Sequence, residues 1–142
     1  MLEPSQPVTV FVIDDNDVDI EAVHRAFRRV KIGNPIAVAH DGKEALQMLR
    51  AGEVPSPYII LLDLNMPGMD GLTFLEELRA DDQLRSSVVF IVTTSDAARD
   101  LQASYQLNVA GYVVKGKIGD DFLRLTGLLE NYWKVVTLPE GE

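Results

Sequence analysis

The chain has 142 residues, a formal net charge of −9, an apolar content of 46% and no cysteine. This length suits a single domain, and the lack of cysteine excludes disulfides and thiolate metal sites. The negative charge argues against nucleic-acid binding, and no apolar run approaches the roughly 20 residues of a membrane span. Residues 1–7 lack the basic and apolar regions of a signal peptide, so we expect a cytoplasmic protein.

Five short apolar runs predict β-strands, because they are rich in β-branched and aromatic residues and are bounded by turn residues. Their ranges are 8–13, 36–39, 58–62, 87–93 and 111–114. Such continuous apolar runs are typical of parallel strands that are buried on both faces of a sheet.

A helical pattern follows each predicted strand. The second helix has a clear start, because Asp41 is followed three residues later by Glu44, a capping pair. The five helices are expected between 16 and 33, from 41 to about 52, and over 72–79, 95–107 and 118–132. Strict alternation predicts one doubly wound α/β domain over 1–142, with helices on both faces of the sheet. Residues 1–7 are expected to be a tail and residues 133–142 a C-terminal extension.

Four of the strands end in polar residues that buried strands do not need. These are Asp14, Asp15, Asp63, the run 93–95 (Thr-Thr-Ser) and Lys115. The carboxyl ends of strands in such a sheet meet at one rim, where three carboxylates would repel without a cation. Mg²⁺ is the favoured cation if a phosphate supplies further oxygens. The pattern predicts Asp63 as a nucleophile that carries phosphate, with Lys115 and a hydroxyl as clamps.

Taken singly, each of these residues has a simpler explanation as a helix cap, a strand end or a surface lysine, so the joint pattern carries the argument. Two other functions fit a similar rim. A small hydrolase with an aspartyl nucleophile usually places that residue after its first strand, whereas the best candidate here follows the third. A flavodoxin-like FMN binder needs a Gly/Ser/Thr-rich phosphate loop, whereas the loop after the first strand is acidic.

The same residues resemble the receiver domain of two-component response regulators, which has the fold of the chemotaxis regulator CheY. The matching segments are 14–15, 63–71, 94–95 and 112–115, and the similarity covers about residues 8–132. The resemblance implies a flavodoxin-like sheet in the order 2-1-3-4-5. It also implies a signalling protein, not an enzyme, that catalyses only its own phosphorylation and dephosphorylation. No DNA-binding output domain follows in the sequence, so we expect a stand-alone receiver.

The resemblance further implies a role for each residue of the acidic rim. Asp63 would accept a phosphoryl group from the phosphohistidine of a sensor histidine kinase, and Lys115 would pair with the acyl phosphate. Asp15 and Asp63 would ligate Mg²⁺ directly, together with the backbone carbonyl of Asn65. Asp14 would act on the cation mainly through water.

The resemblance also implies that a hydroxyl residue and an aromatic residue move when Asp63 is phosphorylated. Thr94 is preferred as the hydroxyl that bonds the phosphoryl oxygen, although counting back from the lysine by the commonest family spacing indicates Thr93. Tyr112 would change its exposure with that movement. Most receivers follow the lysine with proline, whereas Gly116 and then Lys117 follow it here. We therefore expect a more flexible lysine loop.

A narrower resemblance links the chain to small regulators that partner cyanobacterial and bacterial phytochrome kinases. It rests on segments 17–21, 32–35, 93–95 and 132–139. It implies a bacteriophytochrome as the candidate kinase and a homodimer formed through the sheet edge and the C-terminal region. Trp133 and the apolar residues after it would then cover a partner chain, unless Trp133 only caps the core. The sequence does not indicate the downstream protein.

Overall fold

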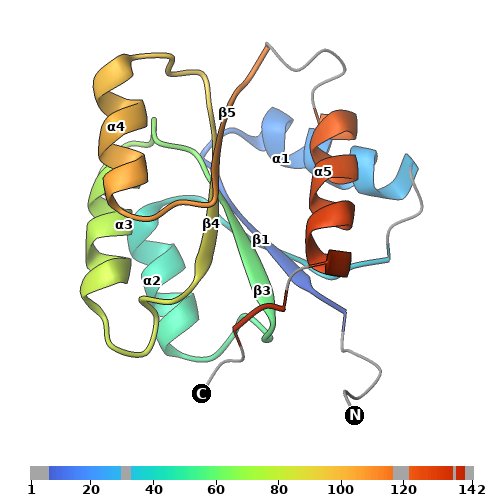
Figure 1. Ribbon diagram of the computed structural model, residues 1–142, viewed down its shortest axis with the longest axis horizontal. Helices are drawn as coiled ribbons and strands as arrows, with labels where there is room; N and C mark the ends of the chain where they lie inside the picture. Colours follow the sequence, from blue (N-terminus) through green and yellow to red (C-terminus); the bar gives the residue numbers. More distant parts are fainter. Residues whose placement is uncertain (1–6, 30–32, 117–121, 136, 140–142) are drawn as a thin grey trace.

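A parallel sheet runs through the middle of the molecule, in a computed structural model that describes residues 7–29, 33–116, 122–135 and 137–139 (Figure 1). Its strands are β1 (Thr9–Ile13), β2 (Ile36–Ala39), β3 (Tyr58–Leu62), β4 (Val88–Thr93) and β5 (Gly111–Val114). They lie in the order β2-β1-β3-β4-β5, and all neighbouring pairs are parallel. The predicted fold class and strand order are confirmed.

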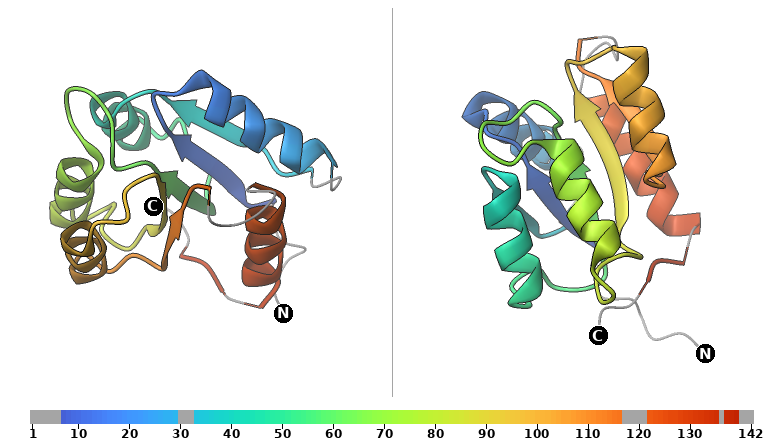
Figure 2. Two further views of the ribbon diagram at one scale, coloured as in Figure 1. Left: turned by 90° about the horizontal axis from the view of Figure 1, so that it is seen from above. Right: turned by 90° about the vertical axis from the view of Figure 1, so that its left-hand side faces the viewer.

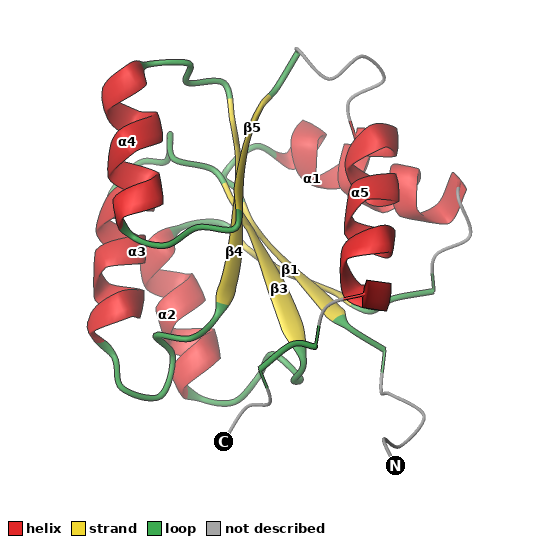
Figure 3. Cartoon of the chain, in the orientation of Figure 1, coloured by secondary structure: helices red, strands yellow, loops and turns green. Residues whose placement is uncertain are grey.

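Helices cover both faces of this sheet. They are α1 (Asp17–Arg29), α2 (Gly42–Arg50), α3 (Gly71–Ala80), α4 (Ala98–Gln106) and α5 (Phe122–Val135). Figures 1 and 2 show α1 and α5 on one face and α2, α3 and α4 on the other. Figure 3 shows the alternation of strands and helices that the sequence predicts. No helix within the described ranges is long and apolar enough to cross a membrane.

Two helix starts follow directly from capping side chains. Asp41 accepts a hydrogen bond from the Glu44 N–H at 2.7 Å, as the capping pair predicts, and Asp70 accepts one from the Thr73 N–H at 2.9 Å. Both bonds satisfy backbone donors that lack partners within the first helical turn. The cap at Asp70 matters for the site, because it fixes where the loop after Asp63 ends.

Two predicted helices differ from the structure at their ends. The fourth begins at Ala98 and not at residue 95, because Ala97 is extended and the Ser95 hydroxyl donates to Asp100. The fifth continues to Val135, so residues 133–135 belong to the helix and not to an extension. Trp133 and Leu138 pack against the core on the α1 and α5 face of the sheet. The predicted start of this helix at 118, residues 1–6 of the predicted tail, and residues 136 and 140–142 of the predicted extension lie outside the described residues.

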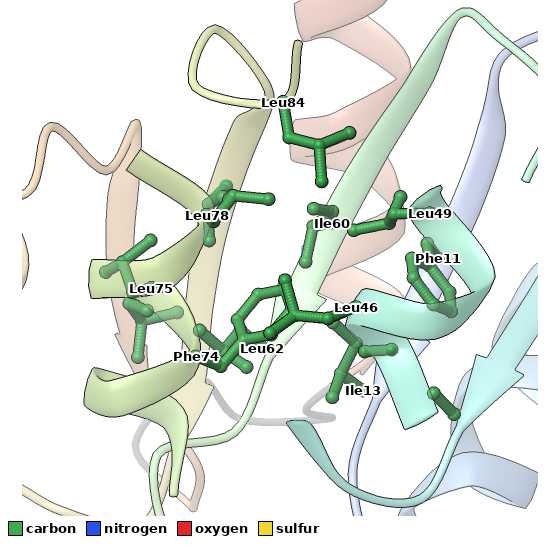
Figure 4. Close-up of a cluster of buried hydrophobic side chains, with 14 of the residues drawn as sticks. Phe11, Ile13, Leu46, Leu49, Ile60, Leu62, Phe74, Leu75, Leu78 and Leu84 are labelled. Carbon is green, nitrogen blue, oxygen red and sulfur yellow. The ribbon is translucent and has the colours of Figure 1, made fainter. Parts of the chain in front are cut away.

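The core consists of two apolar layers, one on each face of the sheet. Alternate residues of a strand point to opposite faces, so Phe11 and Ile13 pack under α2 and α3, while Val10 and Val12 pack under α1 and α5. Figure 4 shows the first layer, where side chains from β1 and β3 meet those of α2 and α3. Because both layers are fully buried, the sheet is a rigid base for the loops at its carboxyl edge.

Gly71, the first residue of α3, yields a stability prediction. A Cβ at this position would lie 2.6 Å from the Asp63 carbonyl oxygen and 2.6 Å from the Leu64 Cα. Both neighbours are backbone atoms, so Gly71→Ala should lower the free energy of unfolding by about 2 kcal/mol. Gly127→Ala is the control, because Gly127 lies inside α5 with open space around it and should gain about 0.5 to 1 kcal/mol. Urea denaturation of both variants tests the pair, and equal stabilities would contradict it.

Candidate functional site

Carboxylates from two neighbouring strands meet at the carboxyl edge of the sheet. Asp14 follows β1 and Asp63 follows β3, and these strands pair with each other in register. Asp14 is 5% exposed and Asp63 7%, whereas Asp15 is exposed. One ligand oxygen from each of the three lies within 4.8 Å of the others. The structure therefore brings the three predicted carboxylates together, with one of them open to solvent.

The two buried carboxylates are held by specific hydrogen bonds. Asp63 Oδ1 accepts from the Thr93 hydroxyl at 2.9 Å and from the Asn65 N–H at 3.1 Å. Asp14 Oδ1 accepts from the Asn16 N–H at 2.9 Å. Buried charges need such partners, because burial without them costs several kcal/mol. The bonds fix one oxygen of each carboxylate and turn the other toward the centre of the site.

Lys115 occupies that centre. Its Nζ donates to Asp14 Oδ2 at 2.9 Å, to Asp19 Oδ2 at 2.7 Å and to Asp63 Oδ2 at 3.3 Å. Its side chain is only 11% exposed, and an ammonium has three donors, so these carboxylates satisfy all of them. The bond to Asp14 joins residues 101 positions apart in the sequence. One cation therefore links β5 to β1, to α1 and to β3.

The pKa values of the site reflect a balance between burial and charge. Burial opposes the ammonium of Lys115, but its bonds to Asp19 and Asp14 and the charge of Asp63 prevail, so its pKa is raised above the ordinary value. Burial raises the pKa of the Asp14 carboxyl, and the ammonium beside it works in the opposite direction. Lys115 is therefore charged at neutral pH and compensates part of the acidic cluster.

The remaining charge fits a divalent cation. The donor set of Asp14, Asp15 and Asp63 consists of carboxylate oxygens, which are the ligands of hard cations such as Mg²⁺. With Asp19 the site holds four carboxylates, three of them in contact with the one ammonium, so it keeps an excess of negative charge. The exposed Asp15 lies on the solvent side, where an ion could enter.

The hydroxyl that reaches Asp63 belongs to Thr93 and not to Thr94. Thr93 is the last residue of β4 and is fully buried, and its hydroxyl points to the carboxylate. Thr94 is exposed, and its oxygen accepts a hydrogen bond from the Asn65 side chain at 3.2 Å. The same Asn65 nitrogen lies 3.4 Å from the Thr93 oxygen, so both hydroxyls border the site, but it is Thr93 that bonds to the Asp63 carboxylate. On this point the structure differs from the sequence-based preference for Thr94 and agrees with the family spacing.

Tyr112 on β5 lies half-buried beside the loop after β4. Its hydroxyl donates to the Ser95 carbonyl oxygen at 2.9 Å, and burial raises its pKa. This bond links the predicted aromatic switch residue to the loop that begins right after Thr93. The structure thus connects Tyr112 to the backbone two residues after Thr93.

Gly116 has φ +86°, in the left-handed region, and is exposed. Proline cannot adopt this conformation, because its ring holds φ near −65°. The glycine that replaces the common proline after the lysine therefore has a backbone conformation that a proline could not adopt. Lys117 lies outside the described residues.

Asp19 is the site residue that the sequence analysis missed. It lies in the first turn of α1, which the Asn16 side chain caps by accepting from the Val18 and Asp19 N–H groups at 2.9 and 3.2 Å. An acidic residue in a first turn is already explained by the helix dipole. No local pattern points from Asp19 to Lys115, because 96 positions separate them.

Comparison with known proteins places these residues in a family context. The model of the response regulator receiver domain matches residues 10–124 of the chain. Response regulator Rcp1 of Synechocystis sp. is 32% identical over 142 residues, which cover 96% of this chain and 97% of that protein. A probable methanogenesis regulatory protein, FilR2 of Methanothrix harundinacea, is 32% identical over 136 residues, or 94% of this chain and 88% of that protein.

Solved structures show the same similarity. The Mn²⁺-bound form of Rcp1 matches with a TM-score of 0.82 at 30% identity, over 94% of this chain and 99% of that one. The phosphorylated cyanobacterial phytochrome response regulator RcpA matches with a TM-score of 0.84 at 29% identity, over 94% and 99%. The hydrolase and FMN-binding alternatives find no support in these matches.

Replacing the central ammonium tests the electrostatics of the site. Lys115→Met leaves two buried carboxylates uncompensated, so in EDTA at pH 7 it should lower the free energy of unfolding by about 3 kcal/mol. Burial already raises the pKa of the Asp14 carboxyl in the folded state, and loss of the ammonium beside it removes the opposing effect. The loss of unfolding free energy relative to wild type is therefore present at pH 7 and should shrink as the pH falls toward 5, because protonation removes the uncompensated charge. Chemical denaturation at both pH values, and with added Mg²⁺, measures it.

Lys134→Met is the matched control for this experiment. Lys134 is 64% exposed and pairs only loosely with Glu130, at 3.8 Å, so its loss should change stability by less than about 0.5 kcal/mol. Added Mg²⁺ should restore much of the stability of Lys115→Met and leave the control unchanged. A Lys115→Met protein as stable as wild type in EDTA would contradict the assigned role of the ammonium.

Proposed function

The chain belongs to the response regulator receiver domain family, and we propose that Asp63 is its phosphoacceptor, phosphorylated by a sensor histidine kinase. One observation carries this proposal. Asp63 Oδ1 is held by Thr93 and Asn65, and Oδ2 faces the Lys115 ammonium. A carboxylate held in this way has a fixed direction of attack, with a cation beside the position where new charge would develop.

The proposed reaction is a phosphoryl transfer between side chains. An Asp63 oxygen attacks the phosphorus of the phosphohistidine, the P–N bond breaks, and the imidazole leaves with the bonding electron pair. The acyl phosphate that forms places its oxygens near Lys115, whose ammonium can pair with one of them. This catalysis would be confined to the chain's own phosphorylation and dephosphorylation.

The acidic cluster is proposed to hold Mg²⁺. Asp15 and Asp63 would bind it directly, with the Asn65 carbonyl, and Asp14 would act mainly through water. When bound, the cation supplies neutralising charge for the phosphoryl oxygens. The geometry of the three carboxylates supports a divalent ion, and the Mn²⁺-bound form of the relative Rcp1 supports it further.

We also propose how the phosphorylated state alters the surface. Phosphorylation converts a carboxylate of one negative charge into an acyl phosphate of about two, and it places strong acceptors next to Thr93. Thr93 would exchange its bond to the carboxylate for one to a phosphoryl oxygen, and the backbone after it would follow. That backbone includes the Ser95 carbonyl, which accepts from Tyr112, so the surface of α4, β5 and α5 would report the change. The change is a shift between existing states.

The proposed kinase partner is a phytochrome. Support comes from the similarity to the phytochrome response regulator RcpA and to a bacteriophytochrome response regulator, AtBRR, at 29% and 31% identity. The homodimer stays a prediction. Leu128 and Val135 on α5 are 49% and 84% exposed, which leaves apolar surface for a second chain.

Substitution of the phosphoacceptor tests the main proposal. With Mg²⁺ and a small phosphodonor such as acetyl phosphate, the wild-type chain should form an acid-stable, alkali-labile adduct, and Asp63→Asn should form none. The control is Asp70→Asn, in the same loop, because Asn caps a helix as well as Asp does and the cap of α3 is kept. Mass spectrometry of the intact chain measures the adduct. Equal labelling of Asp63→Asn and wild type would refute the assignment.

Thr93 and Thr94 can be separated by paired substitutions. Thr93→Ala should still be labelled at Asp63 but should lose the phosphorylation-dependent change in hydrogen exchange over residues 94–106. Thr93→Ser keeps the hydroxyl and should regain that change. Thr94→Ala should behave as wild type, because its side chain does not contact Asp63. A response that is lost in Thr94→Ala and retained in Thr93→Ala would reverse the order of the two residues.

A further inference from the structure

The ammonium of Lys115 is shared unequally among its three acceptors. Asp19 Oδ2 is the nearest at 2.7 Å, Asp14 follows at 2.9 Å, and Asp63 is the farthest at 3.3 Å. Asp14 and Asp63 belong to the cluster that could hold a metal ion, and Asp19 does not. Lys115 therefore has its shortest bond to the one carboxylate that a bound cation would not need.

We propose that Asp19 is a positioning residue, which holds the Lys115 ammonium beside the acidic cluster and so leaves Asp14 and Asp63 free to bind a divalent cation. The inference rests on the proposed function, since Lys115 is the clamp for the phosphoryl group. The physical reason is competition, because an ammonium without another partner would pair more tightly with the oxygens that the cation requires. Asp19 gives the buried ammonium a partner that stays in place when those oxygens are taken.

The fold holds Asp19 in the position that this role requires. Asn16 caps the first turn of α1 through the Asp19 N–H, and the Asn16 N–H in turn donates to Asp14. Ile20, the next residue, is buried in the core, whereas Val18, the preceding one, is 73% exposed. Asp19 therefore lies on the helix between a side chain that faces the core and one that faces solvent. Its own side chain is 26% exposed, and its carboxylate bonds to Lys115 at the rim.

The backbone around Lys115 explains why a partner for its side chain is useful. Upstream, the Lys115 N–H donates to the Thr93 carbonyl at 2.7 Å, which continues the sheet pairing. Downstream stands Gly116, exposed and in the left-handed region, so a residue of maximal backbone freedom replaces the rigid proline common in the family. The ammonium is thus located by its carboxylates, and Asp19 supplies the shortest of these bonds.

A double-mutant cycle on cation binding tests the proposal. Calorimetric titration with Mg²⁺ would compare wild type, Asp19→Asn, Lys115→Met and the double variant. Asp19→Asn should weaken Mg²⁺ binding about three- to tenfold, a coupling typical of residues in contact. In the Lys115→Met background the same substitution should have less than about a twofold effect, because no ammonium remains to compete.

The matched control is Asp17→Asn, which removes the same charge from the same helical turn. Asp17 is 88% exposed and its ion pair is with His40, so its loss should change Mg²⁺ affinity by less than about twofold. If Asp17→Asn weakens binding as much as Asp19→Asn, or if the Asp19 effect persists without Lys115, the effect is one of net charge and the proposal is overturned.

A second variant at residue 19 guards against misfolding, and the Mg²⁺ readout separates this proposal from the phosphoacceptor proposal. Asp19→Ser removes the charge with a residue suited to a first helical turn, and it replaces Asp19→Asn in the cycle if thermal unfolding shows that variant to be misfolded. Mg²⁺ titration needs no phosphodonor, so it is independent of labelling at Asp63. A chain that fails to label but shows the coupling would refute the phosphoacceptor proposal alone, and normal labelling without the coupling would refute the role of Asp19 alone.

Discussion

The site depends on one buried ammonium among several carboxylates. Lys115 lies within hydrogen-bonding distance of Asp14, Asp19 and Asp63, and without it the acidic rim would repel itself. Burial of so many like charges is tolerable only because each buried carboxylate also accepts bonds from the backbone or from a hydroxyl. The arrangement remains short of positive charge, and this deficit favours the binding of a cation.

The two apolar layers provide the rigidity that such a rim requires. Side chains of β1 and β3 alternate between the layers, so a shift of register by one residue would exchange larger and smaller apolar groups, such as Phe11 and Val10, and disrupt the packing of both layers. Gly71 adds a local constraint, because α3 begins in contact with the backbone of Asp63 and Leu64. The direction of the Asp63 carboxylate is therefore set by packing below it and by the helix start beside it.

The sequence was sufficient for the fold and for the acidic rim. Alternating strands and helices imply the parallel sheet, and strand ends in such a sheet share one edge, so Asp14, Asp63 and Lys115 could be placed together without coordinates. The choice between Thr93 and Thr94 could not be made from the strand pattern alone, since that pattern does not show which of two adjacent hydroxyls at the end of β4 reaches Asp63. The role of Asp19 was hidden for a different reason, because a first-turn acidic residue is expected on any helix.

Family membership agrees with the geometry at the level of the whole rim. The family model covers residues 10–124, which include all of the residues around Lys115. Within this rim, Asp19 in the first turn of α1 bonds to the ammonium, and Gly116 in the left-handed region follows the lysine along the backbone.

The sequence separation of the ammonium and its partners also has a consequence for biosynthesis. Lys115 lies 101 residues after Asp14, 96 after Asp19 and 52 after Asp63. A ribosome therefore delivers the carboxylates of the rim well before the cation that compensates them. Four strands can leave the exit tunnel and still lack the charge balance of the finished edge. The rim therefore cannot close before all five strands have been made, and its closure marks a nascent chain that extends at least through β5.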